Sequence, residues 1–167
     1  MTQEQDVAVA VANRLRDRGW TISVGELDTG GLLGSRLIAV PGATRFFRGG
    51  LCCYENRALL VNVARVPAAL VEEKGAGSPE TALALAQGVR ALTDTDLALA
   101  ESGWAGPTGG RHGQPAGLVY IALASRDGQT VVIEENWQST DRYGNMQRTA
   151  ERALRLALDF LEGRLHL

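Results

Sequence analysis

Residues 20–38 constrain the fold most strongly, because they join a strand directly to a helix. The segment Trp20–Val24 is rich in β-branched and apolar residues, which is typical of a buried strand. The segment Leu32–Ile38 spaces its large apolar residues as an amphipathic helix does. Between them lies the turn Gly25-Glu26-Leu27-Asp28-Thr29-Gly30-Gly31. Strands and helices that follow one another in this way predict an α/β protein.

This turn has the chemistry of a cradle for a polar or anionic ligand. Backbone N–H groups at the start of a helix converge on an anion, and the paired glycines let a ligand approach the backbone closely. Asp28 and Thr29 either cap the helix or contact the ligand. The same residue types also suit an ordinary turn, so the turn alone does not decide between a ligand site and a connection.

Composition and charge restrict the class of protein. The 167 residues suffice for one domain with a substantial core. A net charge of −2 gives no electrostatic reason to expect nucleic acid or an anionic membrane as a partner. No run of about 18 apolar residues occurs, and the segment Met1–Asp6 is polar and acidic, unlike a signal peptide. We expect a soluble cytoplasmic protein with no metal site and no cofactor.

The rest of the chain continues the alternation of helices and strands. Asp127-Gly128 is a hairpin signal, so the strands on either side of it should pair antiparallel. No internal repeat or linker is visible. We predict a single-domain three-layer α/β/α sandwich with a mixed sheet over residues 1–167, its core lying within about 6–161. The expected helices are 4–18, 32–38, 55–63, 68–73, 78–92 and 142–164, and the expected strands are 20–24, 46–54, 97–100, 117–124 and 130–137.

Three loops rich in small residues follow predicted strands: the turn after Val24, the segment 54–56 and the segment 102–110. Ligands of α/β sheets bind beyond the carboxyl ends of the strands, so we expect one composite pocket made by these loops. Two arginines of the last helix either supply guanidinium groups for a phosphate or lie on a solvated face. The candidate ligand-binding residues are Thr29, Gly30, Gly31, Tyr54, Asn56, Ser102, Gly103, Ala105, Gly106, Arg142 and Arg148.

Seven short motifs follow one another along the chain. They are Glu-x-x-Thr-Gly-Gly from Glu26, Val-Pro-Gly from Val40, Phe-x-Gly-Gly from Phe47, Tyr-x-Asn-x-Ala from Tyr54, Gly-x-Ala-Gly-Pro-x-Gly from Gly103, Pro-x-Gly-x-Val-Tyr-Ile-Ala from Pro115 and Asp-Arg from Asp141. In this order, over about residues 6–161, they resemble the C-terminal domain of the competence/damage-inducible protein CinA. That family includes stand-alone nicotinamide-nucleotide amidohydrolases. The resemblance implies an α/β/α fold, a homodimer, and a pocket in which nicotinamide mononucleotide is hydrolysed to nicotinic acid mononucleotide and ammonia.

The chain departs from the family pattern where the chemistry should lie. The pattern Glu-Ser-Cys-Thr-Gly-Gly carries the proposed serine nucleophile, and here Leu27 and Asp28 replace its serine and cysteine. The lysine proposed to activate that serine ends Tyr-Ser-Asn-x-Ala-Lys, and here it is Leu59. Leucine neither attacks a carboxamide nor accepts a proton. In the third loop, Trp104 stands where the family has a smaller side chain, and it narrows the pocket, stacks on a ligand or simply packs.

Three hypotheses follow from these departures. We prefer a non-hydrolytic relative without catalytic residues, which retains a pocket for a nucleotide-like small molecule. An alternative is an amidohydrolase with substitute groups: Asp28 or Glu26 activating water, or Cys52 or Cys53 as a nucleophile if its pKa is lowered. The two cysteines are adjacent, so we expect reduced thiols rather than a disulfide. Thr29 and Ser102 also offer hydroxyl groups, but no neighbouring base is evident, because His112 lies in a glycine-rich loop and His166 in the C-terminal tail. The third hypothesis is a structural or regulatory partner whose vestigial pocket is blocked by Leu27, Leu59 and Trp104.

Overall fold

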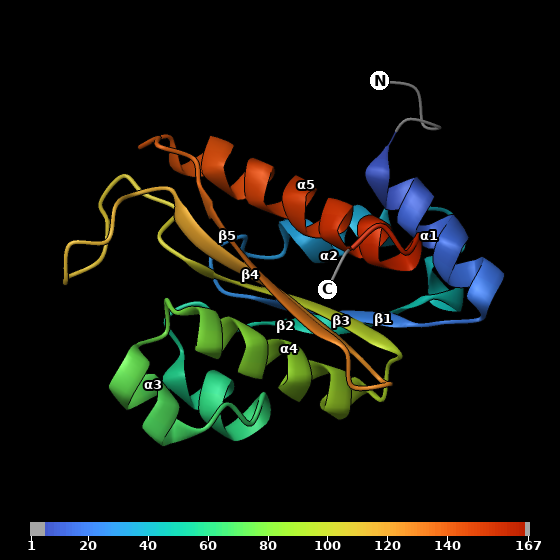
Figure 1. Ribbon diagram of the computed structural model, residues 1–167, viewed down its shortest axis with the longest axis horizontal. Helices are drawn as coiled ribbons and strands as arrows, with labels where there is room; N and C mark the ends of the chain where they lie inside the picture. Colours follow the sequence, from blue (N-terminus) through green and yellow to red (C-terminus); the bar gives the residue numbers. More distant parts are fainter. Residues whose placement is uncertain (1–5, 166–167) are drawn as a thin grey trace.

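A five-stranded mixed sheet runs through the middle of the computed structural model, which describes residues 6–165 (Figure 1). Helices cover both of its faces, three on one side and two on the other, so the α/β/α sandwich is confirmed. The elements are α1 (Val7–Arg18), β1 (Ile22–Glu26), α2 (Leu32–Ile38), η2 (Ala43–Arg45), β2 (Phe47–Cys52), η3 (Leu59–Val63), α3 (Ala68–Lys74), α4 (Pro79–Thr93), β3 (Leu97–Gly103), β4 (Leu118–Ser125), β5 (Thr130–Asn136) and α5 (Arg142–Leu161).

The sheet has the strand order β2-β1-β3-β4-β5. β1 pairs parallel with β2 and with β3, whereas β4 pairs antiparallel with β3 and with β5. The register places Glu26 of β1 beside Glu101 of β3 on one side and beside Cys52 of β2 on the other. The carboxyl ends of the three parallel strands therefore meet at one edge, which is where the predicted loops begin.

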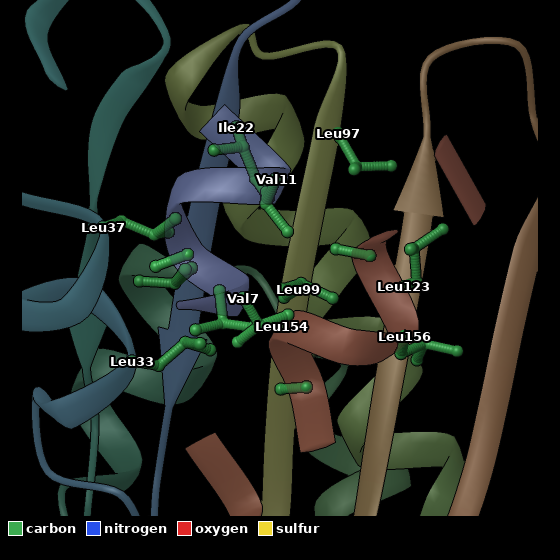
Figure 2. Close-up of a cluster of buried hydrophobic side chains, with 14 of the residues drawn as sticks. Val7, Val11, Ile22, Leu33, Leu37, Leu97, Leu99, Leu123, Leu154 and Leu156 are labelled. Atoms are coloured by element: carbon green, nitrogen blue, oxygen red, sulfur yellow. The ribbon is translucent and has the colours of Figure 1, made fainter. Parts of the chain in front are cut away.

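The larger apolar core fills the space between the sheet and the helices α1, α2 and α5. Leu33 of α2, Leu99 of β3 and Leu154 of α5 point toward one another there, and all three are fully buried (Figure 2). Sequence signals fix the ends of the helices around this core. Asp6 caps α1 by accepting from the N–H of Ala8, and Asp141 caps α5 by accepting from the N–H of Gly144.

The second apolar core lies on the other face of the sheet, under α4. It joins Leu85 of α4 to Leu27, Cys53 and Leu60 from the ends of β1, β2 and the start of η3. Ser78 caps α4 through a hydrogen bond from the N–H of Thr81, with Pro79 at the first helical position, as the sequence predicts.

Several predicted boundaries differ from the structure. The strand predicted over 46–54 ends at Cys52, and the segment predicted as a short helix over 55–63 contains the π-helical turn η3. The strand predicted over 97–100 continues to Gly103, because the carboxyl group of Glu101 finds hydrogen-bond donors inside the fold. α5 ends at Leu161, where Gly163 adopts a left-handed φ of 68°. Glu4, the predicted start of the first helix, and His166 lie outside the described residues.

No helix within residues 6–165 is both long enough and apolar enough to cross a membrane.

Candidate functional site

The three predicted loops meet beside the first turns of α5. Arg142 Nη1 donates to the carbonyl of Gly106 at 2.7 Å, and the Arg142 guanidinium lies 6.0 Å from the ring centre of Tyr54. Asn145 Nδ2 donates to the carbonyl of Ala105 at 2.8 Å. The Asp28 carboxyl group of the first loop lies close enough to Arg142 for its pKa to respond to that charge. These contacts bring the loops together at one edge of the sheet, and the composite pocket stays a prediction.

The first loop is held from inside by the carboxyl group of Glu101. Oε1 of this side chain accepts from the backbone N–H groups of Leu27, Asp28 and Thr29 at 2.8, 2.9 and 2.9 Å. Three consecutive amides therefore point at a single oxygen, which is fully buried with the rest of the Glu101 side chain. These N–H groups, which the sequence suggests are free for a ligand, already have an acceptor in the protein.

Glu26 satisfies the next part of the same turn. Its Oε2 accepts from the N–H of Gly31 at 2.8 Å and of Leu33 at 3.1 Å, and its Oε1 accepts from the N–H of Gly34 at 2.9 Å. This carboxylate is therefore the N-terminal acceptor of α2, whose N-cap, Gly31, makes no side-chain capping bond. Glu26 acts as a structural anchor and does not face an open site.

The hydroxyl of Thr29 links the two carboxyl groups. Thr29 Oγ1 lies 2.5 Å from Glu26 Oε2 and 2.8 Å from Glu101 Oε1, and the side chain is completely buried. Because the hydroxyl carries a single hydrogen, it can donate to only one of the two carboxyl groups at a time. The hydroxyl of Thr29, a candidate ligand-binding residue, thus contacts groups inside the loop and does not face a ligand.

The carboxyl groups of Asp28 and Glu101 form a coupled acidic pair. Burial and the nearby Asp28 charge raise the pKa of Glu101 to about 8, while hydrogen bonds from Thr29 and Asp28 act in the opposite direction. Burial raises the pKa of Asp28 to about 6, against the lowering effect of Arg142. Asp28 Oδ2 is buried and finds no hydrogen-bond partner among residues 6–165. Near neutral pH the pair therefore retains a proton that isolated carboxyl groups would have lost.

Leu27 and Leu59 both belong to the apolar core under α4. Leu27 is 5% exposed and packs in one cluster with Cys53 and Leu60. Leu59 is partly buried and packs against the same cluster. Both leucines therefore contribute hydrocarbon to this core.

The two cysteines do not supply a replacement nucleophile. Both are free thiols, so the expectation of reduced cysteines is confirmed. Burial raises the pKa of both Cys52 and Cys53, and the Glu26 charge raises that of Cys52 further. A cysteine nucleophile needs a lowered pKa, so the raised pKa values of these two thiols do not favour the cysteine alternative.

Ser102 and Trp104 of the third loop contact neighbouring parts of the protein. The hydroxyl of Ser102 donates to the carbonyl of Ala76. Trp104 lies against two glycines: a Cβ atom added to Gly77 or to Gly110 would come within 2.7 Å of the indole. Of the three roles considered for this indole, packing is the one that these contacts support.

The remaining candidate residues fall into two groups. Tyr54 is 56% exposed and has a φ of 40°, a left-handed conformation that is unusual for a bulky residue. Asn56 accepts from the N–H of Leu59, the first residue of η3, at 3.1 Å. Arg148 lies 5.9 Å from the Trp137 ring centre and lines a groove of about 480 Å³ along α5. Arg148 therefore borders a different surface from Tyr54.

The glycines of the first and third loops allow backbone conformations and close contacts that other residues would not. Gly30 and Gly31 have φ values of 62° and 100°, and Gly106 has a φ of 105°. A Cβ atom on Gly103 would lie 2.3 Å from the carbonyl oxygen of Leu118 on the paired strand. These positions shape the loops whether or not a ligand is bound.

A model of the CinA C-terminal domain matches residues 4–161. The chain belongs to the CinA C-terminal domain family. It is 47% identical over 115 residues to a putative competence-damage inducible protein of Desulforudis audaxviator, an alignment that covers 69% of this chain and 28% of that protein. It is 38% identical over 164 residues to a CinA-like protein of Koribacter versatilis, covering 98% and 38% of the two chains. The chain thus spans about a third of the length of these curated relatives.

Solved structures of the CinA superfamily have the same fold. The crystal structure of a superfamily protein from Klebsiella pneumoniae 700603 matches with a TM-score of 0.89 and 29% identity, covering 94% of this chain and 96% of that one. The competence or damage-inducible protein from Enterobacter asburiae matches with a TM-score of 0.88 and 28% identity, covering 93% and 96%. The membership in the CinA family that seven short motifs indicate is therefore confirmed.

Two residues of this CinA domain escaped the sequence reasoning. The predicted strand 97–100 stops before Glu101, although an acidic residue that continues the apolar run of β3 signals a buried acceptor. Asn145 lies in α5 and donates from Nδ2 to Ala105 and Ser139, both at 2.8 Å, while being almost fully buried. No local sequence pattern distinguishes this asparagine from an exposed one.

Proposed function

We propose that this CinA family domain binds a nucleotide-like small molecule and does not hydrolyse it by the serine–lysine route of the family pattern. The observation that carries the proposal is the packing of Leu27 and Leu59 in the core under α4. An aliphatic side chain has neither a lone pair for attack on a carboxamide nor a site for the released proton. In addition, Glu101 occupies the amides of residues 27–29, which leaves these donors unable to stabilise an oxyanion.

The polar rim formed by Tyr54, Arg142 and Asp28 is the proposed contact surface for the ligand. The exposed ring of Tyr54 offers a face for a flat base, and its left-handed backbone is the kind of strain that clusters at functional sites. The Arg142 guanidinium lies against that ring and suits a phosphate group. The carboxyl group of Asp28 suits a hydrogen-bond donor such as an amide or a hydroxyl group.

Calorimetric titration with nicotinamide mononucleotide tests binding, and an ammonia assay on the same sample tests hydrolysis. We expect measurable heat at millimolar ligand without ammonia release. Arg142→Gln should weaken binding by about tenfold, the effect of losing one charge-assisted contact. Arg155→Gln, which removes an exposed arginine paired with Glu151 on α5, is the matched control and should leave the affinity unchanged. Absence of heat at millimolar ligand would contradict binding.

A second candidate function is hydrolysis by Asp28 in place of the missing dyad. The observation that favours it is the raised pKa of Asp28, about 6, which suits a general base near neutral pH. Ammonia release from a panel of nucleotide amides, lost in Asp28→Asn, would support this candidate. The packing of Leu27 and Leu59 in the core under α4 makes the binding function the first choice.

A further inference from the structure

We infer that the backbone amides of residues 27–29 form a carboxylate-binding nest, and that the side chain of Glu101 is its built-in occupant. The inference concerns the interior of the first loop, and it holds whether or not the rim at Tyr54 and Arg142 binds a nucleotide. Its ligand class is a small monocarboxylate of the size of acetate, which the nest can accept when the glutamate side chain is removed.

The contacts around Glu101 are those of a bound carboxyl group. Oε1 receives three backbone N–H groups at 2.8 to 2.9 Å and lies 2.8 Å from the hydroxyl of Thr29. Oε2 lies 3.2 Å from the N–H of Asp28. Successive backbone N–H groups that converge on one point make an anion-binding concavity. The loop therefore presents a complete donor set to a single carboxyl group.

The occupant comes from a distant part of the chain. Glu101 lies 74 residues after Leu27 and reaches the loop from the neighbouring strand β3. It is fully buried, so solvent anions cannot compete for the amides while it is present. The Glu101 side chain thus fills the position of a bound ligand, and external oxyanions cannot bind to these amides.

Truncation of Glu101 identifies the ligand that fits. Glu101→Ala retains Cβ and removes one methylene and the carboxyl group, and these atoms together have the size and shape of acetate. We expect acetate to restore the missing hydrogen bonds, formate to fill the space incompletely, and butyrate to be too large. A stabilisation that is larger for acetate than for formate or butyrate depends on the size of the anion. A general effect of salt would not show this dependence.

Thermal unfolding of Glu101→Ala in different sodium salts tests the inference. At about 100 mM, acetate should raise the Tm by roughly 2–4 °C above chloride, given a Kd of about 10 mM. The wild-type protein should show no such difference, because its nest is full. Leu99→Ala is the matched control: it also opens a cavity on buried β3, but next to apolar neighbours, and acetate should not stabilise it.

Two results would overturn the inference: equal stabilisation of Glu101→Ala by acetate, butyrate and chloride, or equal stabilisation of Leu99→Ala by acetate. If Glu101→Ala folds in no salt, hydrogen exchange of the wild-type protein decides. The amides of residues 27–29 should then exchange at least about 100-fold more slowly than that of Gly113 in the exposed loop. Similar rates at both places would show that the nest is not formed.

Discussion

Glu26 and Glu101 are register partners on the parallel strands β1 and β3, and the hydroxyl of Thr29 contacts the carboxyl groups of both, at 2.5 and 2.8 Å. Each carboxyl group accepts from three backbone N–H groups. The donors to Glu101 lie in the turn that follows β1, and the donors to Glu26 are Gly31 and two residues of the first turn of α2. Two buried acids thus fix the loop that the family pattern uses for its nucleophile. The loop keeps its shape through its own side chains and needs no ligand to complete its hydrogen bonds.

Thr29→Val should destabilise the protein strongly, because it replaces the bridging hydroxyl by a methyl group of similar size. One buried carboxyl group then loses its hydroxyl donor, and we expect a loss of about 1–3 kcal/mol in the free energy of unfolding. Thr29→Ser retains the hydroxyl and should cost less. Urea unfolding of the two variants measures the difference, and equal stability of the two would contradict the bridge.

The stability should fall as the pH rises from about 5 to about 8. The folded-state pKa values of Asp28 and Glu101 are raised to about 6 and about 8, so the folded protein binds more protons than the unfolded chain in this range. The stability that the protonated forms of these two groups contribute is therefore fully present at low pH. It is lost as the pH rises through their folded-state pKa values. The slope should approach about 1.4 kcal/mol per pH unit for each proton bound.

The variant Asp28→Asn provides the control for this dependence. It removes one titrating group and also the charge that raises the pKa of Glu101. Urea unfolding across pH 5–8 should therefore give a flatter profile for this variant. A wild-type protein whose stability rises with pH over this range would contradict the raised pKa values of Asp28 and Glu101.

The sequence predicts the architecture well and the inside of the site poorly. The β-branched run before Gly25, the hairpin signal at Asp127-Gly128 and the periodic stripe of the last helix are local signals, and each produced an element close to the observed one. The role of Glu101 depends on a register between strands more than 70 residues apart, which no local pattern encodes. The topology rule predicts that the three loops meet at one edge of the sheet. It does not predict that side chains of the protein itself accept the hydrogen bonds of the loop amides.

Gly88→Ala should destabilise the protein by about 1–3 kcal/mol or more. A Cβ atom at Gly88 in α4 would lie 1.7 Å from the carbonyl oxygen of Ala64, which follows η3, so the backbone must move. Gln87→Ala changes the adjacent exposed position of the same helix and should be nearly neutral. Equal unfolding midpoints of the two variants would contradict the close approach of α4 to this segment.

Leu27→Ser, which restores the hydroxyl of the family pattern, should cost roughly 2–4 kcal/mol of stability. The reason is that Leu27 fills part of the core under α4 and is almost completely buried. Leu92→Ser, at an exposed position of α4, is the control and should cost less than about 1 kcal/mol. A Leu27→Ser protein as stable as the wild type would show that this side chain is not part of the core.

The most direct test of the account is the release of ammonia from nicotinamide mononucleotide by the purified wild-type protein at neutral pH. With Leu27 and Leu59 in the core and Glu101 on the loop amides, we predict no release above the buffer control over several hours. Release that grows in proportion to protein concentration and persists across independent purifications would contradict the account.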